Sequence, residues 1–189
     1  RDLWGLGEMP FYEVELAPFT YGGDGTTGAR IREAQHKAVE LIPGSGIASI
    51  NDLAYPYEYD EIHPRRKKEV GERLSYLALN RTYGMDYLPC EGPRFKSYEV
   101  RGGEIEVAFY NGESGFSPWH DIVGFEIAGE DKVFHPAEIR RGTRLNTVIV
   151  KSGKVPAPVA VRYCFRDFQV GNFTGRRCLP VIPFRTDNW

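Results

Sequence analysis

The chain has 189 residues, of which 24 are basic and 26 acidic, and its formal net charge is −2. A hydrophobic fraction of 41% and a charged fraction of 26% are typical of a folded globular chain, which excludes a disordered or low-complexity protein. The balanced charge gives no excess of basic residues for binding nucleic acid. No run of consecutive apolar residues reaches the roughly 18 that a membrane helix needs. We therefore expect neither nucleic acid nor a membrane as a partner.

Residues 1–88 alternate short apolar runs with helical periods. Phe11 to Leu16 has the composition of a strand, and a second short strand is predicted at Ile47 to Ile50. Between them, apolar residues recur at the spacing of one helix face: Ile31, Ala34, Ala38, Val39 and Ile42. A second helix is expected to begin near Pro64 and to end near Gly84. This alternation predicts a parallel sheet covered by helices.

The first half poses a physical problem, because a parallel sheet is buried on both faces and its edges need cover. Two strands and two helices do not provide that cover. We therefore expect further strands to be supplied from upstream of Arg1 or by another chain.

Residues 89–189 follow a period of two instead. Tyr98 and Val100 lead into a turn at Gly102 and Gly103, after which apolar residues alternate again, which predicts a β-hairpin. Three further strands are expected at residues 122–128, 147–150 and 159–165, with no helix among them. The second half is predicted to form an antiparallel β-sandwich.

A glycine-rich segment, residues 23–28, spells GxGxxG before the first helix. A dinucleotide fingerprint needs its first glycine directly at the strand end, so that the helix N-terminus meets the pyrophosphate. Here residues 17–22 intervene, and Ala29 and Arg30 stand where a P-loop needs Lys and Ser or Thr. The segment is better interpreted as a plain glycine loop.

The segment Asp60-Glu61-Ile62-His63 is a candidate catalytic element. An imidazole titrates near neutrality, so a positioned histidine can take a proton from a nucleophile and return it to a leaving group. A carboxylate three residues earlier could fix the tautomer of the ring, and Glu61 competes with Asp60 for that role. The alternative interpretation is an exposed turn that begins the second helix.

No nucleophile accompanies His63 in an obvious motif, since the chain contains no G-x-S-x-G elbow. Ser45 and Ser114 are each next to glycine, but both fit ordinary loops. Three cysteines, at positions 90, 164 and 178, allow at most one disulfide and lack metal-ligand spacing, so no metal is expected. Trp119, Trp189 and several tyrosines offer aromatic faces for stacking on sugar rings, although packing is their commoner use.

Five segments in order resemble the carboxyl-terminal part of the sialate O-acetylesterase family. They are MPFYEVELAPF at residues 9–19, DEIHPRRKKEVGERLSYLALNRTYG at 60–84, FEIAGEDKVFHPAEI at 125–139, PVAVRYCF at 158–165 and LPVIPFRTDNW at 179–189. Two positions depart from the usual pattern of the family: Glu15 stands where glutamine is usual, and Phe165 where tryptophan is common.

The resemblance implies the C-terminal part of a flavodoxin-like SGNH α/β/α domain at residues 1–88, followed by an antiparallel β-sandwich accessory domain at residues 89–189. It implies a serine-type carbohydrate esterase without cofactor, acting on an O-acetylated glycan or sialic acid. His63 would be the general base and Asp60 its orienting carboxylate. The serine nucleophile would come from an upstream segment or a partner chain, so the chain alone is expected to be inactive.

The resemblance favours a secreted or periplasmic location. The alternative function is a non-catalytic remnant or a carbohydrate-binding β-sandwich module.

Overall fold

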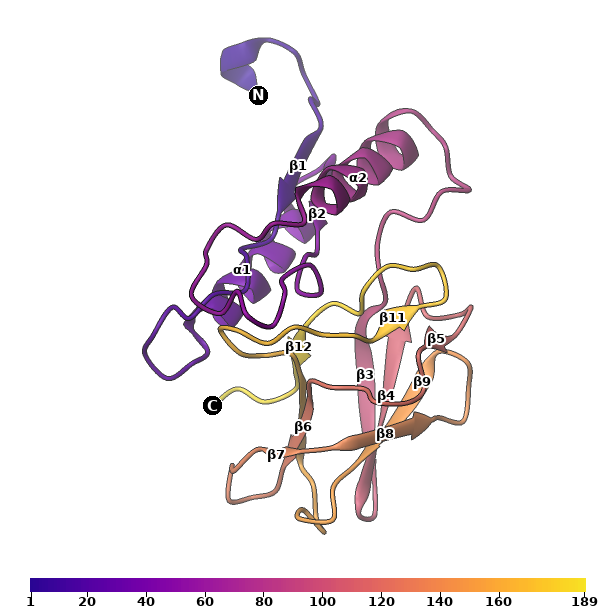
Figure 1. Ribbon diagram of the computed structural model, residues 1–189. Helices are drawn as coiled ribbons and strands as arrows, with labels where there is room; N and C mark the ends of the chain where they lie inside the picture. Colours follow the sequence, from indigo (N-terminus) through magenta and orange to yellow (C-terminus); the bar gives the residue numbers. More distant parts are fainter.

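The computed structural model describes residues 1–189 and contains two α-helices, α1 (Thr27–Leu41) and α2 (Lys67–Leu77), among short strands (Figure 1). A 3-10 turn at Asp2–Trp4 precedes them, and α2 continues into a π-helical turn at Ala78–Thr82. The strands are β1 (Phe11–Val14), β2 (Ser45–Ala48), β3 (Arg94–Arg101), β4 (Glu104–Tyr110), β5 (Phe116–Ser117), β6 (Phe125–Ala128), β7 (His135–Pro136), β8 (Glu138–Arg141), β9 (Thr147–Lys151), β10 (Ala160–Tyr163), β11 (Thr174–Gly175) and β12 (Phe184–Arg185).

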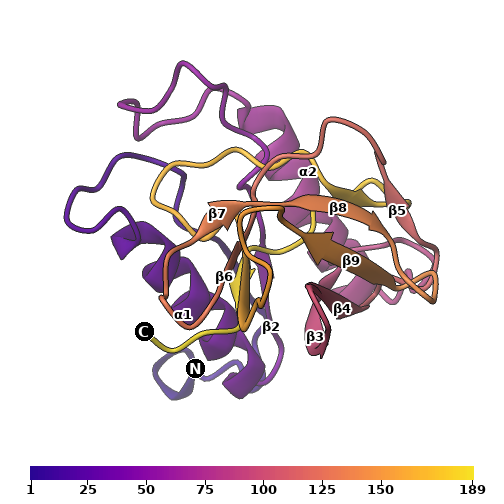
Figure 2. The same ribbon diagram turned by 90° about the horizontal axis from the view of Figure 1, so that it is seen from below.

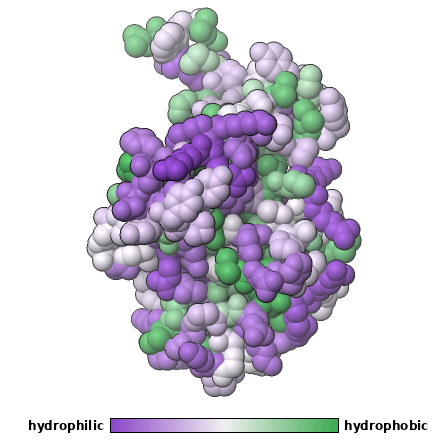
Figure 3. Space-filling model, in the orientation of Figure 1, coloured by the Kyte–Doolittle hydropathy of each residue, from purple (hydrophilic) through white to green (hydrophobic).

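The upper part of Figure 1 is built on β1 and β2, which pair in parallel and place Phe11 opposite Ser45. Both helices contact β2, and α2 also contacts β1. The two strands pair only with each other, so no further strand extends either edge of this sheet; β2 is buried throughout, whereas β1 is partly exposed. The N-terminal segment projects from the rest of the chain at the top of Figures 1 and 3. Its Leu3 and Trp4 are exposed.

The lower part contains two four-stranded antiparallel sheets, in the orders β3-β4-β9-β8 and β12-β10-β6-β7. The expected hairpin is present: β3 and β4 are joined at Gly102, whose φ of 60° lies in the left-handed region that glycine adopts readily. Figure 2 shows β7 and β8 following one another across this part, and the segment changes sheets because β7 pairs with β6 whereas β8 pairs with β9.

One hydrophobic core lies between these two sheets. Inward-facing side chains of both sheets are fully buried in it, among them Val107 and Val150 of the first sheet and Ile127 and Val161 of the second. Phe173, which follows β10, closes the end of the core and stacks on Phe116 with ring centroids 4.9 Å apart. Burying such aromatic and branched side chains contributes about 1.5–3 kcal/mol each, so this core stabilises the antiparallel part.

The expected flavodoxin-like SGNH α/β/α fold class is wrong for this chain. The structure is mostly strands, with only two helices, and its strands form several small sheets that are antiparallel apart from the β1–β2 pair. Local periodicity correctly indicated a parallel strand pair with helices against it. A three-layer α/β/α domain also needs a wide parallel sheet, and two strands do not form one.

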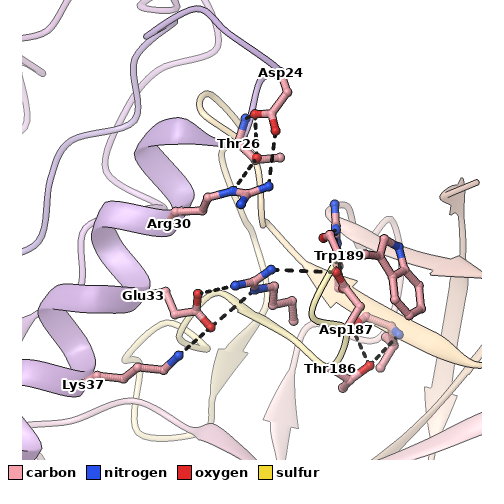
Figure 4. Close-up of polar contacts among 11 residues, drawn as sticks. Asp24, Thr26, Arg30, Glu33, Lys37, Thr186, Asp187 and Trp189 are labelled. Carbon is pink, nitrogen blue, oxygen red and sulfur yellow. Dashed lines mark hydrogen bonds and ion pairs between the residues drawn. The ribbon is translucent and has the colours of Figure 1, made fainter. Parts of the chain in front are cut away.

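Charged contacts join the two parts of the chain. Glu33 of α1 accepts hydrogen bonds from Arg185 of β12, at 3.0 and 3.4 Å, and also pairs with Lys37 one turn later (Figure 4). Glu40, further along α1, pairs with Arg94 at the start of β3. The helix therefore meets strands from both antiparallel sheets, and these contacts fix how α1 sits on the lower part.

Gly92, just before β3, gives a direct test of how the parts are joined. It is buried, and a Cβ there would overlap the backbone carbonyl oxygen of Pro180. We expect Gly92→Ala to lower the free energy of unfolding by about 1–3 kcal/mol, because one backbone segment must move. The matched variant is Gly71→Ala in α2, where a Cβ meets nothing within 4 Å. It should raise stability by about 0.5–1 kcal/mol through helix propensity. Urea denaturation measures both, and an unchanged midpoint for Gly92→Ala would contradict this close approach.

Candidate active site

The loop between β2 and α2 carries Asp60 and His63, and tertiary contacts hold it in place. The backbone N–H and the hydroxyl of Thr20 both donate to the carbonyl oxygen of Tyr59, at 3.0 and 2.7 Å. Tyr59 immediately precedes Asp60. The glycine-rich β1–α1 connection therefore supports the candidate catalytic segment from a distant part of the sequence.

Glu58 closes the same loop from inside. Its residue is only 2% exposed, and its carboxylate accepts hydrogen bonds from the backbone N–H groups of Tyr55, at 2.8 Å, and Arg65, at 3.2 Å. The guanidinium of Arg65 lies 3.6 Å from the same carboxylate. One buried side chain thus joins the two ends of the segment that contains Asp60 and His63, which limits how far these residues can move relative to α2.

The His63 side chain is 82% exposed, and its carboxylate neighbour is Glu61. Glu61 Oε1 accepts a hydrogen bond from the His63 backbone N–H at 3.0 Å and lies 3.5 Å from the ring Nδ1. Asp60 forms no hydrogen bond or ion pair with His63. The structure thus places Asp60 and His63 on one loop, three residues apart, and brings Glu61 to the imidazole. An exposed imidazole beside a carboxylate can act as a general base once a substrate or a partner group lies within hydrogen-bond distance of it.

Exposed aromatic side chains lie on the same loop. The rings of Tyr55 and Tyr57 stack with centroids 5.3 Å apart, and the Arg65 guanidinium lies 5.7 Å from the Tyr57 ring centroid. Tyr59 is also more than half exposed. Tyrosine rings present apolar faces and a polar tip, so this loop offers a surface suited to sugar rings next to His63.

Of the two glycine-flanked serines, the structure removes Ser45 as a candidate nucleophile. The buried hydroxyl of Ser45 donates to the carbonyl oxygens of Val39 and Ile42, at 2.8 and 2.6 Å, and so caps the end of α1. Ser114 is exposed but lies in the antiparallel part of the chain. No serine hydroxyl is hydrogen-bonded to His63, whose side chain pairs only with Glu61.

The three cysteines are free, so the single disulfide that the sequence allowed is not formed. Burial raises the pKa of the Cys164 thiol to about 12, and burial together with the neighbouring Glu91 raises the pKa of Cys90. These two thiols stay protonated at neutral pH and are poor nucleophiles. No cluster of three or more histidine, cysteine or acidic side chains is arranged to hold a metal ion.

The glycine-rich segment has a structural partner that sequence reasoning missed. Asp167, which follows β10, accepts a hydrogen bond at 2.6 Å from the backbone N–H of Gly28 in the first turn of α1. Arg32 of the same helix is buried and donates to the carbonyl oxygens of Arg166 and Asp167. A carboxylate therefore occupies the position at the helix N-terminus where a dinucleotide phosphate would bind. The separation of 139 positions in the sequence explains why no sequence pattern revealed this contact.

Glu15 is a second group whose role sequence reasoning did not identify. It lies just after β1 and is fully buried, and its Oε1 accepts hydrogen bonds from the Ser49 hydroxyl and from the backbone N–H groups of Ile50 and Asn51, at 2.5–2.8 Å. Its Oε2 lies 2.9 Å from His36 Nε2 on α1. This carboxylate therefore fixes the start of the loop that leads to His63.

The ionisation of Glu15 follows from these contacts. Burial opposes the charged form, but the hydrogen bond and positive charge of His36 outweigh it, with further help from Arg32 and Ser49, so the pKa of Glu15 lies below its ordinary value. The carboxylate is thus charged and paired inside the fold at neutral pH.

Neither helix has the length and apolar character that a membrane crossing requires. No family model matches the chain, and no curated protein matches it. Among solved structures, the chain is similar to the crystal structure of a carbohydrate acetylesterase from Xanthomonas citri, with 39% sequence identity and a TM-score of 0.85. The match covers 98% of this chain and 43% of that one, so the chain spans less than half the length of the acetylesterase that it resembles in fold and sequence.

Proposed function

We propose that the chain is the part of a serine-type carbohydrate O-acetylesterase that carries the general base. The observation that carries this proposal is the similarity, over almost the whole chain, to a carbohydrate acetylesterase at 39% identity. The substrate would be an acetyl ester on a hydroxyl of a glycan or of sialic acid. The exposed tyrosines on the loop that carries His63 support a sugar as the group that this loop binds.

In this proposal His63 accepts the proton of a serine hydroxyl as the hydroxyl oxygen attacks the acetyl carbonyl carbon. His63 then returns that proton to the sugar oxygen as the carbon–oxygen ester bond breaks, which leaves an acetyl-serine. Water, activated by the same imidazole, releases acetate in a second step. A carboxylate on the loop holds the ring and stabilises the imidazolium.

The nucleophile in this proposal comes from an upstream segment or a partner chain. Three features support such a complement: the partly exposed β1, whose outer edge pairs with no strand, the exposed Ile31 and Leu41 on α1, and the exposed Leu3 and Trp4 of the N-terminal arm. Unpaired strand edges and apolar side chains of this kind favour association with another segment.

The test is acetate release from acetylated sugars. The chain alone should hydrolyse 4-nitrophenyl acetate only at the background rate, because a base without a nucleophile supplies no covalent route. The chain joined to, or mixed with, the segment that carries the serine should release acetate from an O-acetylated oligosaccharide. Absence of turnover in the combined protein would instead support the alternative function, a carbohydrate-binding module without activity.

Two amide substitutions separate the carboxylates that compete to orient His63. The family resemblance assigns this role to Asp60, whereas Glu61 lies 3.5 Å from the imidazole. We expect Glu61→Gln to lower kcat/KM at least about 10-fold, because the protonated ring of His63 then loses the negative charge that orients and stabilises it. Asp60→Asn should lower kcat/KM by a smaller factor. Steady-state kinetics of the combined protein measure both. A larger loss in Asp60→Asn would assign the role to Asp60, through a loop rearrangement on binding of the complement.

A further inference from the structure

The antiparallel part of the chain contains a pocket of about 380 Å³, a volume at the lower end of the range of roughly 300–1,000 Å³ for small-molecule sites. The pocket is formed by the segment around β5, the β8–β9 connection and the turn after β11. Its lining combines apolar side chains with three arginines: Phe116, Trp119 and Leu145, and Arg141, Arg144 and Arg176. It shares no residue with the loop that carries His63.

The three arginines have no acidic partner. Neighbouring arginines on the same sheet are paired: Arg140 with Glu104 at 2.7 Å, and Arg101 with Glu106. Arg141, Arg144 and Arg176 form no ion pair. In a chain of net charge −2, three unpaired guanidinium groups around one pocket are a local concentration of positive charge.

The guanidinium group of Arg141 is held in place by an aromatic ring. Arg141 lies over the Trp119 ring at 5.2 Å from its centroid, and Trp119 itself packs edge-on against Phe116 and Phe173 of the core. An arginine stacked on an indole face keeps the N–H donors in its own plane free for a planar acceptor. Trp119 therefore acts as a positioning residue for Arg141.

The loop that supplies Arg144 is fixed as well. Buried Glu106 accepts hydrogen bonds from the backbone N–H and hydroxyl of Thr143, at 2.7 and 2.6 Å, and from the hydroxyl of Thr147 at 2.8 Å. Its other oxygen pairs with Arg101. Both oxygens of the Glu106 carboxylate are thus engaged, and this carboxylate anchors the loop without pairing with an arginine of the pocket.

We propose that this pocket binds a carboxylate-bearing sugar residue, such as a uronic acid unit of an acidic glycan. Guanidinium groups match a carboxylate in a bidentate geometry, and the apolar floor suits the C–H face of a sugar ring. The pocket is concave and small, whereas a nucleic acid duplex requires a long basic stripe. The site goes beyond the esterase proposal, because binding can be measured without turnover.

Isothermal titration calorimetry of the chain with trigalacturonic acid tests the proposal. The same trisaccharide with its carboxyl groups reduced to alcohols serves as the uncharged control ligand. We expect the acid to bind and the reduced form to bind at least 10-fold more weakly. The triple variant Arg141→Ala/Arg144→Ala/Arg176→Ala should weaken binding of the acid at least 10-fold. Arg140→Ala and Arg177→Ala, which remove the same charge from adjacent positions, should stay within two-fold of the unmodified chain.

Circular dichroism confirms that each variant is folded, and the single variant Arg176→Ala, at an exposed turn, serves if the triple variant is not. Equal binding of the neutral trisaccharide overturns the proposal, as does an equal loss in the two control variants. Inorganic phosphate that binds as tightly as the acidic trisaccharide also overturns it, in favour of a general anion patch. The proposal is also overturned if the chain does not bind trigalacturonic acid at millimolar concentration.

Discussion

Replacing His63 by asparagine should lower kcat/KM for acetyl ester hydrolysis by about 10²–10⁴-fold in the complete esterase, because general base catalysis contributes that much. The His63 side chain is 82% exposed and its one ion pair is with Glu61, so the variant should fold like the unmodified protein. Acetate release and thermal denaturation, measured on the same preparation, check both parts of this expectation.

The matched control is His120→Asn, the same substitution at another exposed histidine in the antiparallel part. It should leave kcat/KM within two-fold of the unmodified enzyme. If folded His63→Asn retained near normal kcat/KM, the assignment of the base would fail. Residues 60–63 would then be a surface turn that leads into α2.

The second large effect is expected at Glu15. Glu15→Ala leaves the backbone N–H groups of Ile50 and Asn51 and the imidazole of His36 without their acceptor inside the fold. Breaking a buried pair in this way costs about 3–5 kcal/mol of unfolding free energy. Urea denaturation at neutral pH measures the loss. Since these amides begin the loop that carries His63, activity should fall together with stability.

Glu15→Gln is the matched variant, because a glutamine carbonyl oxygen can still accept from Ser49, Ile50 and Asn51 while its NH₂ group donates to a neutral His36. It should cost clearly less than Glu15→Ala. Glu15→Gln also separates the effect of the charge from that of the side-chain shape. The folded-state pKa of Glu15 lies below its ordinary value of 4.5, so the negative charge of Glu15 stabilises the fold at pH values above 4.5.

This stabilisation is lost as the pH falls through the lowered pKa of folded Glu15. Denaturation midpoints between pH 7 and pH 3 should therefore decline more steeply in the unmodified protein than in Glu15→Gln. Parallel pH profiles for the two proteins would show that the pKa of Glu15 is the same in the folded and unfolded states, and a steeper decline in Glu15→Gln would show that folding raises it.

Local sequence patterns located both helices and the longer strands, but not the short strands β5, β7, β8, β11 and β12. The apolar run at residues 11–16 contains the strand β1, the helical spacing after residue 30 lies in α1, and Gly102 and Gly103 form the turn of the β3–β4 hairpin. The position of Asp60 and His63 on one loop ahead of α2 is likewise a local property, because three residues cannot lie far apart. Period, turn residues and helix starts act over a few residues, which makes them readable from the sequence.

Even within α1, the face that is buried was decided by tertiary contacts. The spacing placed Ile31 on the covered face, but Ile31 is 46% exposed and Arg32 is 3% exposed. Arg32 points inward because the carbonyl oxygens of Arg166 and Asp167 accept its N–H groups. Periodicity identifies an apolar stripe, whereas the surface that meets the helix determines which residues of the helix are covered.

The fold class and the remaining sites depended on the tertiary structure. The same strand–helix pattern suits a wide parallel sheet or an isolated pair, and only the pairing of β1 with β2 alone distinguishes them. Asp167 reaches the N-terminus of α1 across 139 residues, and the arginine pocket gathers side chains from three segments. The sequence by itself determined both helices and the longer strands, because these rest on local geometry, and it supplied His63 as a candidate base. Which distant groups meet is set by packing between surfaces, and a single sequence does not record that packing.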